Sequence, residues 1–292
     1  MSLDAVLLVL LATVMHASWN LLVRAKRVEA ACFWRMHLAV VALGAPAALA
    51  GALLLPAWDG VVTLAVAASG VCCGFYFFCL ARAYGEGDFT TVYPAARALP
   101  VLAVAAADVL RGRHPSVAGW IGMVGVAVGC FLVPLHSIRE LRLARYFNRA
   151  TLWILGAAAG TVGYSLIDKI AQEHIPRGPA SAALYCYWFY ACSAAALALF
   201  FRLAGHKLPR PAGLGWTVPA AAGALSFASY AIVLSVYQFT SRASYVVALR
   251  QFSIVIGVVA GFALFREPGR FVRTAGACVI TAGLVLLAVW GR

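Results

Sequence analysis

Long apolar runs follow one another along the whole chain, separated by short segments rich in charged residues, glycine and proline. A run of about 20 apolar residues spans a bilayer as an α-helix. The pattern predicts ten such helices, over residues 3–23, 31–55, 60–81, 90–110, 117–135, 150–168, 180–201, 213–239, 243–264 and 271–290. Little sequence lies between them, so we expect an all-α integral membrane protein without a soluble domain. The first run lacks a basic leader and a small-residue cleavage site, and we expect it to be a retained helix.

The composition agrees with this class. Of the 292 residues, 64% are hydrophobic and 11% are charged, whereas a soluble domain has about 25% charged residues. The net charge of +13 does not indicate nucleic acid, because the basic residues lie mainly in short loops, as membrane orientation requires. The eight cysteines fall inside predicted helices without metal-type spacing. We therefore predict no nucleic-acid partner, no metal and no cofactor.

The two halves of the chain repeat one pattern. Residues 84–115 and 237–268 align at a constant offset of 153, and the glycines that follow align one residue out of register. The aligned pairs are Arg97 with Arg250, Arg113 with Arg266, Gly122 with Gly276 and Gly129 with Gly283. The sequence thus predicts a first repeat over 1–136, a basic amphipathic connector over 137–149 and a second repeat over 150–292.

Each repeat holds five predicted helices, and an odd number makes the second copy enter the membrane from the opposite face. Inverted repeats of this kind are the plan of many secondary transporters, with the binding site near the midplane at the repeat interface. An ancient duplication in a purely structural membrane protein is the alternative.

Several short motifs carry a resemblance to a known family. They are His16-Ala-Ser-Trp-Asn20, Tyr93-Pro-Ala-Ala-Arg97, Tyr164-Ser-Leu-Ile-Asp-Lys169 and Tyr245-Val-Val-Ala-Leu-Arg250. On these residues the chain resembles the drug/metabolite transporter superfamily, in its EamA-type ten-helix branch, over essentially its whole length. The resemblance implies transport of a small metabolite, usually export, and it names no substrate. The chain departs from the family at His114, where an acidic residue is usual.

Arg97 and Arg250 lie in runs that are otherwise almost wholly apolar. An arginine at that depth costs at least about 2.5–3.5 kcal/mol and usually faces a cavity or a partner. By inversion the pair would bracket the midplane, roughly 10 Å apart along the membrane normal. Carboxylate partners are scarce, since the helices offer only Asp108 and Asp168, which we place near helix ends. A transported anion would supply the missing charge; the alternative is that each guanidinium bonds helix carbonyls freed by Pro94, Pro100 or a kink.

Further candidate substrate ligands share a polar or aromatic side chain inside a predicted helix: Tyr93, His16, Trp19, Asn20, Tyr76, Tyr164, Tyr230 and Tyr237. The three from the first helix lie on one face of it, and histidine exchanges its proton near neutral pH; helix–helix hydrogen bonding is the alternative for its two polar members. By the resemblance, the tyrosines belong to cavity helices, where they could stack on or hydrogen-bond a solute. The aromatics of residues 185–190 we assign to an interfacial belt or to packing.

We therefore predict a multi-pass protein of the cell inner membrane that moves a small metabolite with an anionic group by alternating access, as an exporter if the resemblance holds. An amino acid or related zwitterion, a phosphonate and an organic acid are the candidate solutes. The alternatives are an exporter of cationic or hydrophobic drugs and a non-transporting membrane binding protein. No nucleophile–base pair appears, so we expect no enzyme. Proton antiport would depend on His16 or Asp168, and exchange, facilitated diffusion and a homodimer are left open.

Two signals disagree on orientation. The odd-numbered loops hold 14 Lys and Arg residues, and the other face, termini included, holds six. The positive-inside rule then places both termini outside the cytoplasm, whereas the family resemblance implies the reverse. A reporter fused after Arg292 decides between them.

Overall fold

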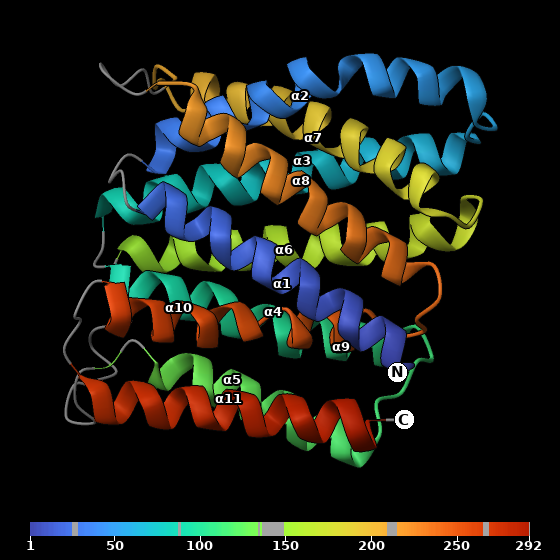
Figure 1. The fold of residues 1–292 in the computed structure, drawn as a ribbon. Helices are drawn as coiled ribbons and strands as arrows, with labels where there is room; N and C mark the ends of the chain where they lie inside the picture. The colour runs from blue at the N-terminus through green and yellow to red at the C-terminus, as the bar shows by residue number, and fades with distance from the viewer. Residues whose placement is uncertain are drawn as a thin grey trace.

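The computed structural model describes residues 1–24, 29–86, 89–133, 135, 149–208, 215–264 and 269–291, and across these ranges the chain is helical without a strand. The connector predicted over 137–149 lies outside them except for its last residue. The helices run side by side in one bundle (Figure 1). They are α1 (Leu3–Arg24), α2 (Glu29–Leu54), α3 (Gly60–Glu86), α4 (Phe89–Leu110), α5 (Val117–Leu132), α6 (Arg149–His174), α7 (Pro179–Leu203), α8 (Thr217–Tyr237), α9 (Ala243–Leu249), α10 (Phe252–Leu264) and α11 (Arg270–Trp290).

The outer surface of the bundle suits lipid. Within the described residues, eight segments are long and apolar enough to cross a membrane, with α9 and α10 counted as one, and α5 is a shorter apolar helix. Large apolar side chains such as Leu53 and Leu64 are more than two-thirds exposed, which in water would be an aggregation hazard. The prediction of an all-α integral membrane fold is confirmed.

The two halves are inverted copies. Figure 1 shows α1 starting at the end of the bundle where both termini lie, and α6, its counterpart, running in the opposite direction. The packing is reciprocal as well: α3 packs on α6 as α8 packs on α1, α2 packs on α7, and α5 packs on α11. Such reciprocal contacts follow from a two-fold axis that relates the repeats.

Glycines hold α5 and α11 close together. A Cβ added to Gly122 would lie 2.7 Å from the carbonyl oxygen of Gly283, and one added to Gly129 would lie 2.7 Å from that of Gly276. Small residues let membrane helices approach to this distance. These are the four glycines that the repeat aligns, so the two helices cross symmetrically.

The predicted continuous helix over 243–264 is wrong at one point, because it breaks at Arg250 and Gln251. The carbonyl oxygen of Arg250 accepts hydrogen bonds from the Ser253 hydroxyl at 2.9 Å and from Arg97 Nη2 at 3.5 Å. The backbone around the break closes with three-residue hydrogen bonds. Side chains therefore use an acceptor that a regular helix would bond internally, and they sustain the break.

The C-terminal ends of three predicted helices differ by three residues or more. The helix over 60–81 continues to Glu86, the one over 150–168 continues to His174, and the one over 117–135 ends at Leu132. The continuation places Asp168 inside α6, not near its end as expected. It is tolerated because the charged residues in this turn, Lys169 and Glu173, pair with each other.

Candidate functional site

A small chamber lies between the repeats. Residues of α1, α3, α4, α6, α7, α8 and α9 line it, together with the break that follows α9. The centres of water-sized molecules can occupy about 50 Å³ of it, which is room for a few waters.

Arg97, from α4, joins the two repeats at this chamber. Its Nη1 lies 2.8 Å from His16 Nε2, and its Nη2 donates to the Ser253 hydroxyl and to the Arg250 carbonyl. Bonding to a helix carbonyl was the alternative explanation for this arginine, and it holds in part. That carbonyl belongs to the helix break that follows α9 in the second repeat, which agrees with the expected alternative of a kink.

His16 is the central member of a polar group on α1. Its Nδ1 lies 3.2 Å from Trp19 Nε1, which donates. A neutral imidazole accepts at one nitrogen only, so His16 accepts either from Trp19 or from Arg97 at one time. Asn20 donates its amide to the His16 carbonyl at 2.7 Å and does not line the chamber.

Arg250 has different neighbours from its repeat mate. Its guanidinium carbon lies 5.4 Å from the ring centroid of Tyr230, within the range of a cation–π interaction. The Tyr164 hydroxyl is a second partner. Among the side chains that the structure describes, no carboxylate forms an ion pair with Arg250. The positive charge is held by aromatic groups.

Aromatic rings form most of the remaining wall: Trp19, Tyr76, Phe77, Tyr164, Phe189, Tyr190 and Tyr230. They contact one another through edges and faces, with Tyr164 5.8 Å from Tyr230 and Phe189 4.8 Å from Tyr230 between ring centroids. Phe189 and Tyr190 had been assigned to a belt or to packing. The four-residue spacing of Tyr185 and Phe189 on one face of α7 was the signal that could have identified an inward-facing stripe.

Two predicted ligands lie elsewhere. Tyr237 is fully buried but does not line the chamber, and the side chain of Tyr93 lies outside the described residues. Conversely, Gln251 and the two serines of α8, Ser226 and Ser229, line the chamber and were missed. A single serine or glutamine in an apolar helix carries no sequence signal that separates it from a packing residue.

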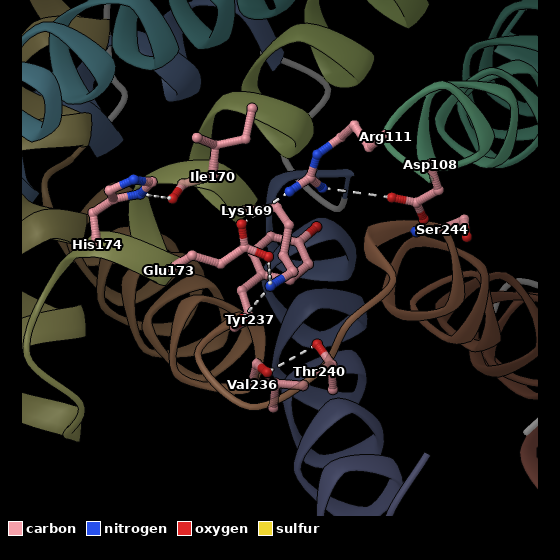
Figure 2. A network of polar contacts seen from close by, with 10 residues as sticks. All are labelled: Asp108, Arg111, Lys169, Ile170, Glu173, His174, Val236, Tyr237, Thr240 and Ser244. Carbon is pink, nitrogen blue, oxygen red and sulfur yellow. Dashed lines mark hydrogen bonds and ion pairs between the residues drawn. The ribbon is translucent and has the colours of Figure 1, made fainter. Parts of the chain in front are cut away.

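A buried ion pair lies beyond the chamber, where the C-terminal end of α6 meets the end of α8 (Figure 2). Lys169, only 2% exposed, donates to Glu173 Oε1 at 2.7 Å and to the carbonyl of Tyr237 at 2.8 Å. Arg111 Nη2 reaches the other oxygen of Glu173 at 2.9 Å. One carboxylate thus binds cations from both repeats.

The same network continues to the start of α9 (Figure 2). Arg111 Nη1 lies 3.7 Å from Asp108 Oδ1, and Asp108 Oδ2 accepts from the backbone N–H of Ser244 at 2.8 Å. The end of α4 is thereby tied to three helices of the second repeat, on the face that carries both termini (Figure 1).

Inverted five-helix repeats that enclose a chamber with charged groups at their interface define the architecture of a secondary transporter. Comparison with known proteins gives the family. Residues 3–135 match the model of the EamA-like transporter family. The resemblance found in the sequence is confirmed by this match, which covers the first repeat, and members of the matched family are membrane transporters of the drug/metabolite type.

The fold extends over both halves. A crystal structure described only as that of a protein shares 20% sequence identity and superposes with a TM-score of 0.69, covering 100% of this chain and 99% of the other. At that identity the likeness concerns the fold alone. No curated protein matches the sequence.

Proposed function

We propose that the protein exports a small metabolite with an anionic group across the cell inner membrane by alternating access. The observation that carries the proposal is Arg250: a permanently charged side chain lines the chamber and is held by aromatic rings. A cation removed from water normally has an anionic partner. Asp168 is separated from Arg250 by the ring of Tyr230 and makes no direct ion pair with it, so a bound solute would provide a direct anionic partner.

The chemistry of the guanidinium narrows the solute class. Its planar fork matches carboxylate, phosphonate and phosphate oxygens through two parallel hydrogen bonds. The aromatic wall suits a small apolar or zwitterionic remainder. An amino acid or related zwitterion, a phosphonate or an organic acid fits both features, whereas a cationic drug would meet two like charges.

Arg97 and Arg250 come from inverted copies, which supports a shared role in the transport cycle. In the proposed cycle the repeats rock against each other and the anionic group passes from one guanidinium to the other. Arg97 would have to exchange its bonds to Ser253 and the Arg250 carbonyl for bonds to the solute.

The test begins with a thermal-shift panel of amino acids, phosphonates, organic acids and cationic dyes on the purified protein. A ligand at about 100 times its Kd stabilises the folded state by about 2.7 kcal/mol. Radiolabelled flux of the strongest anionic ligand into proteoliposomes then follows. Saturable binding without flux would identify a binding protein, and stabilisation by cationic dyes alone would favour a drug exporter.

Variants assign the role of Arg250. We expect Arg250→Ala to abolish flux, and Arg250→Lys to keep weak binding because lysine lacks the fork. Arg35→Ala is the matched control: it also removes one arginine charge, from a side chain of α2 that lies over Trp216, with 5.3 Å between the guanidinium carbon and the ring centroid. Normal flux in Arg250→Ala would contradict the proposal.

A further inference from the structure

Asp168 is a buried carboxylate that has no role in the proposed binding of an anion. Its side chain in α6 is fully inaccessible to solvent. Tyr185 of α7 donates to Oδ1 at 2.8 Å, and Tyr230 of α8 donates to Oδ2. The adjacent Lys169 is directed to Glu173 and forms no ion pair with Asp168. Two phenol hydroxyls thus bind the carboxylate directly.

Tyr230 connects this carboxylate to the chamber. The hydroxyl of Tyr230 bonds Asp168, and its ring faces the guanidinium of Arg250 at 5.4 Å. Hydrogen bonds from Ser69, Tyr230 and Tyr185 favour the ionised carboxylate most, and the positive charge of Arg250, across the ring of Tyr230, adds to them. Asp168 and Arg250 are a separated pair of opposite charges, one outside the chamber and one inside it.

The other titratable groups around Asp168 are uncharged near neutral pH. Apart from the charged Arg250, those that face it are Cys72 and Cys73 of α3, Tyr185 and Cys186 of α7, and Tyr230 and Tyr237 of α8. Thiols and phenols titrate above pH 8 as a rule. From α4, which also packs on α6, the charged groups are Arg97 at the chamber and the Asp108–Arg111 pair beside Glu173.

A solute anion changes this balance. A carboxylate in a dry environment stays ionised only with nearby positive charge or hydrogen bonds to its charged form. When an anionic group binds Arg250, the charge of that guanidinium is compensated and no longer supports Asp168. Protonation of Asp168 then restores neutrality, with one phenol hydroxyl turning from donor to acceptor.

We propose that Asp168 is the proton-binding site of the transporter, and that it takes up a proton from water when a solute anion binds Arg250. The proton and the anion then cross in the same direction, outward in the proposed export and driven by the solute's own gradient, and both are released on the other side when the anion leaves. This inference rests on the proposed anion site at Arg250. His16 is the less suitable proton carrier, because an imidazolium would face the guanidinium of Arg97 at 2.8 Å.

Infrared difference spectroscopy on the purified protein tests the link between the two charges without any ligand. The carbonyl band of protonated Asp168 is followed against pH in the wild type and in Arg250→Met, which mimics a compensated arginine. We expect the titration midpoint to rise by at least about one pH unit in Arg250→Met, a tenfold gain in proton affinity. Arg35→Met, the matched control, should leave the midpoint unchanged, and an equal midpoint in Arg250→Met overturns the proposal.

Two variants assign the band. Asp168→Asn removes it. Because that variant is at risk of misfolding, Tyr185→Phe is the second choice: it deletes one hydrogen bond to Oδ1 and should shift the band while Asp168 stays in place. A band that neither variant changes belongs to another carboxyl, and the Asp168 assignment then falls.

Proton uptake on binding is the second measurement, with methylphosphonate as the anion and a pH-indicating dye in weak buffer. The difference between the wild type and Asp168→Asn, or Asp168→Glu where Asn does not fold, isolates the proton bound at this site. We expect about one extra proton per bound anion in the wild type. Equal uptake overturns the proposal. Failure of methylphosphonate to stabilise the wild type counts against the anion site instead, and the infrared titration still decides whether Asp168 responds to Arg250.

Discussion

Replacing Glu173 by glutamine is expected to destabilise the protein more than replacing its partner Lys169 by methionine. The two changes leave different charged groups behind. Glu173→Gln leaves an ammonium that is 2% exposed, and among the described residues the Tyr237 carbonyl, at 2.8 Å, is the acceptor that remains for it. Lys169→Met leaves a carboxylate that is 31% exposed and still paired with Arg111 at 2.9 Å.

The structure sets the size of the effect. Breaking a fully buried pair costs about 3–5 kcal/mol, and an exposed pair contributes about 0–1 kcal/mol. With Glu173 one-third exposed, Glu173→Gln should cost about 2–3 kcal/mol. Lys169→Met leaves the Tyr237 carbonyl without its donor, a loss of about 1–3 kcal/mol, offset in part because no charge is buried any longer, so we expect about 1 kcal/mol.

The double variant makes the comparison decisive. It removes the stranded charge together with its partner, so it should cost no more than Lys169→Met alone, a coupling energy of about 2 kcal/mol. Unfolding is followed by circular dichroism in mixed micelles of rising SDS content. Asp4→Asn, at an exposed position, is the control and should change stability by less than about 0.5 kcal/mol. Additive costs, or a larger loss in Lys169→Met, would refute the assignment of this pair as buried and coupled.

Three other outcomes follow from the packing. Gly129→Ala should lower stability in the same assay by about 1–3 kcal/mol, because the new Cβ would meet the carbonyl of Gly276 at 2.7 Å. Gly257→Ala, where a Cβ meets no atom within 4 Å, is the matched control and should be neutral or stabilising by up to about 1 kcal/mol; equal losses would contradict the close α5–α11 approach. Ser253→Ala removes an acceptor that competes for Arg97, so the Kd for an anionic ligand, measured by thermal shift, should fall; an unchanged Kd would mean that Arg97 never exchanges partners. Arg97→Lys should reduce flux at subsaturating ligand, and full activity would show that the fork is not used.

The bundle could be predicted from the sequence because the signals are long and repeated. An apolar run of about 20 residues leaves few alternatives to a spanning helix, and the 153-residue offset gave the inversion. The break at Arg250 could not be predicted, since the sequence there has neither proline nor glycine. Pro94 and Pro100, by contrast, lie within α4, which is continuous. At the break, the carbonyl of Arg250 accepts from Arg97 of α4, a contact that a single sequence does not show.

The charged residues of the site could be predicted from the sequence, whereas the residues that contact them could not. Arg97 and Arg250 stood out because an isolated guanidinium in an apolar run needs compensation. Asp168 was expected near a helix end, since Lys169 follows it directly. Inside α6, Asp168 is bound by Tyr185 and Tyr230, and Lys169 is bound by Glu173. The two tyrosines lie far from Asp168 in the sequence, and Glu173 lies one helical turn after Lys169.

The two aligned arginines have diverged in their surroundings, and this bears on what each can do. Arg97 donates to Ser253 and to a backbone carbonyl and lies beside His16, whereas Arg250 lies over the ring of Tyr230. Hydrogen bonds to a charged donor each contribute about 1.5–3 kcal/mol, so loss of Arg97 should appear first in the free energy of unfolding. Replacing Arg250 removes a cation that lies against aromatic rings, and the first effect should be a lower affinity for the anion. Equal effects of Arg97→Ala and Arg250→Ala on both quantities would mean that the duplicated positions have kept one role, in spite of their different neighbours.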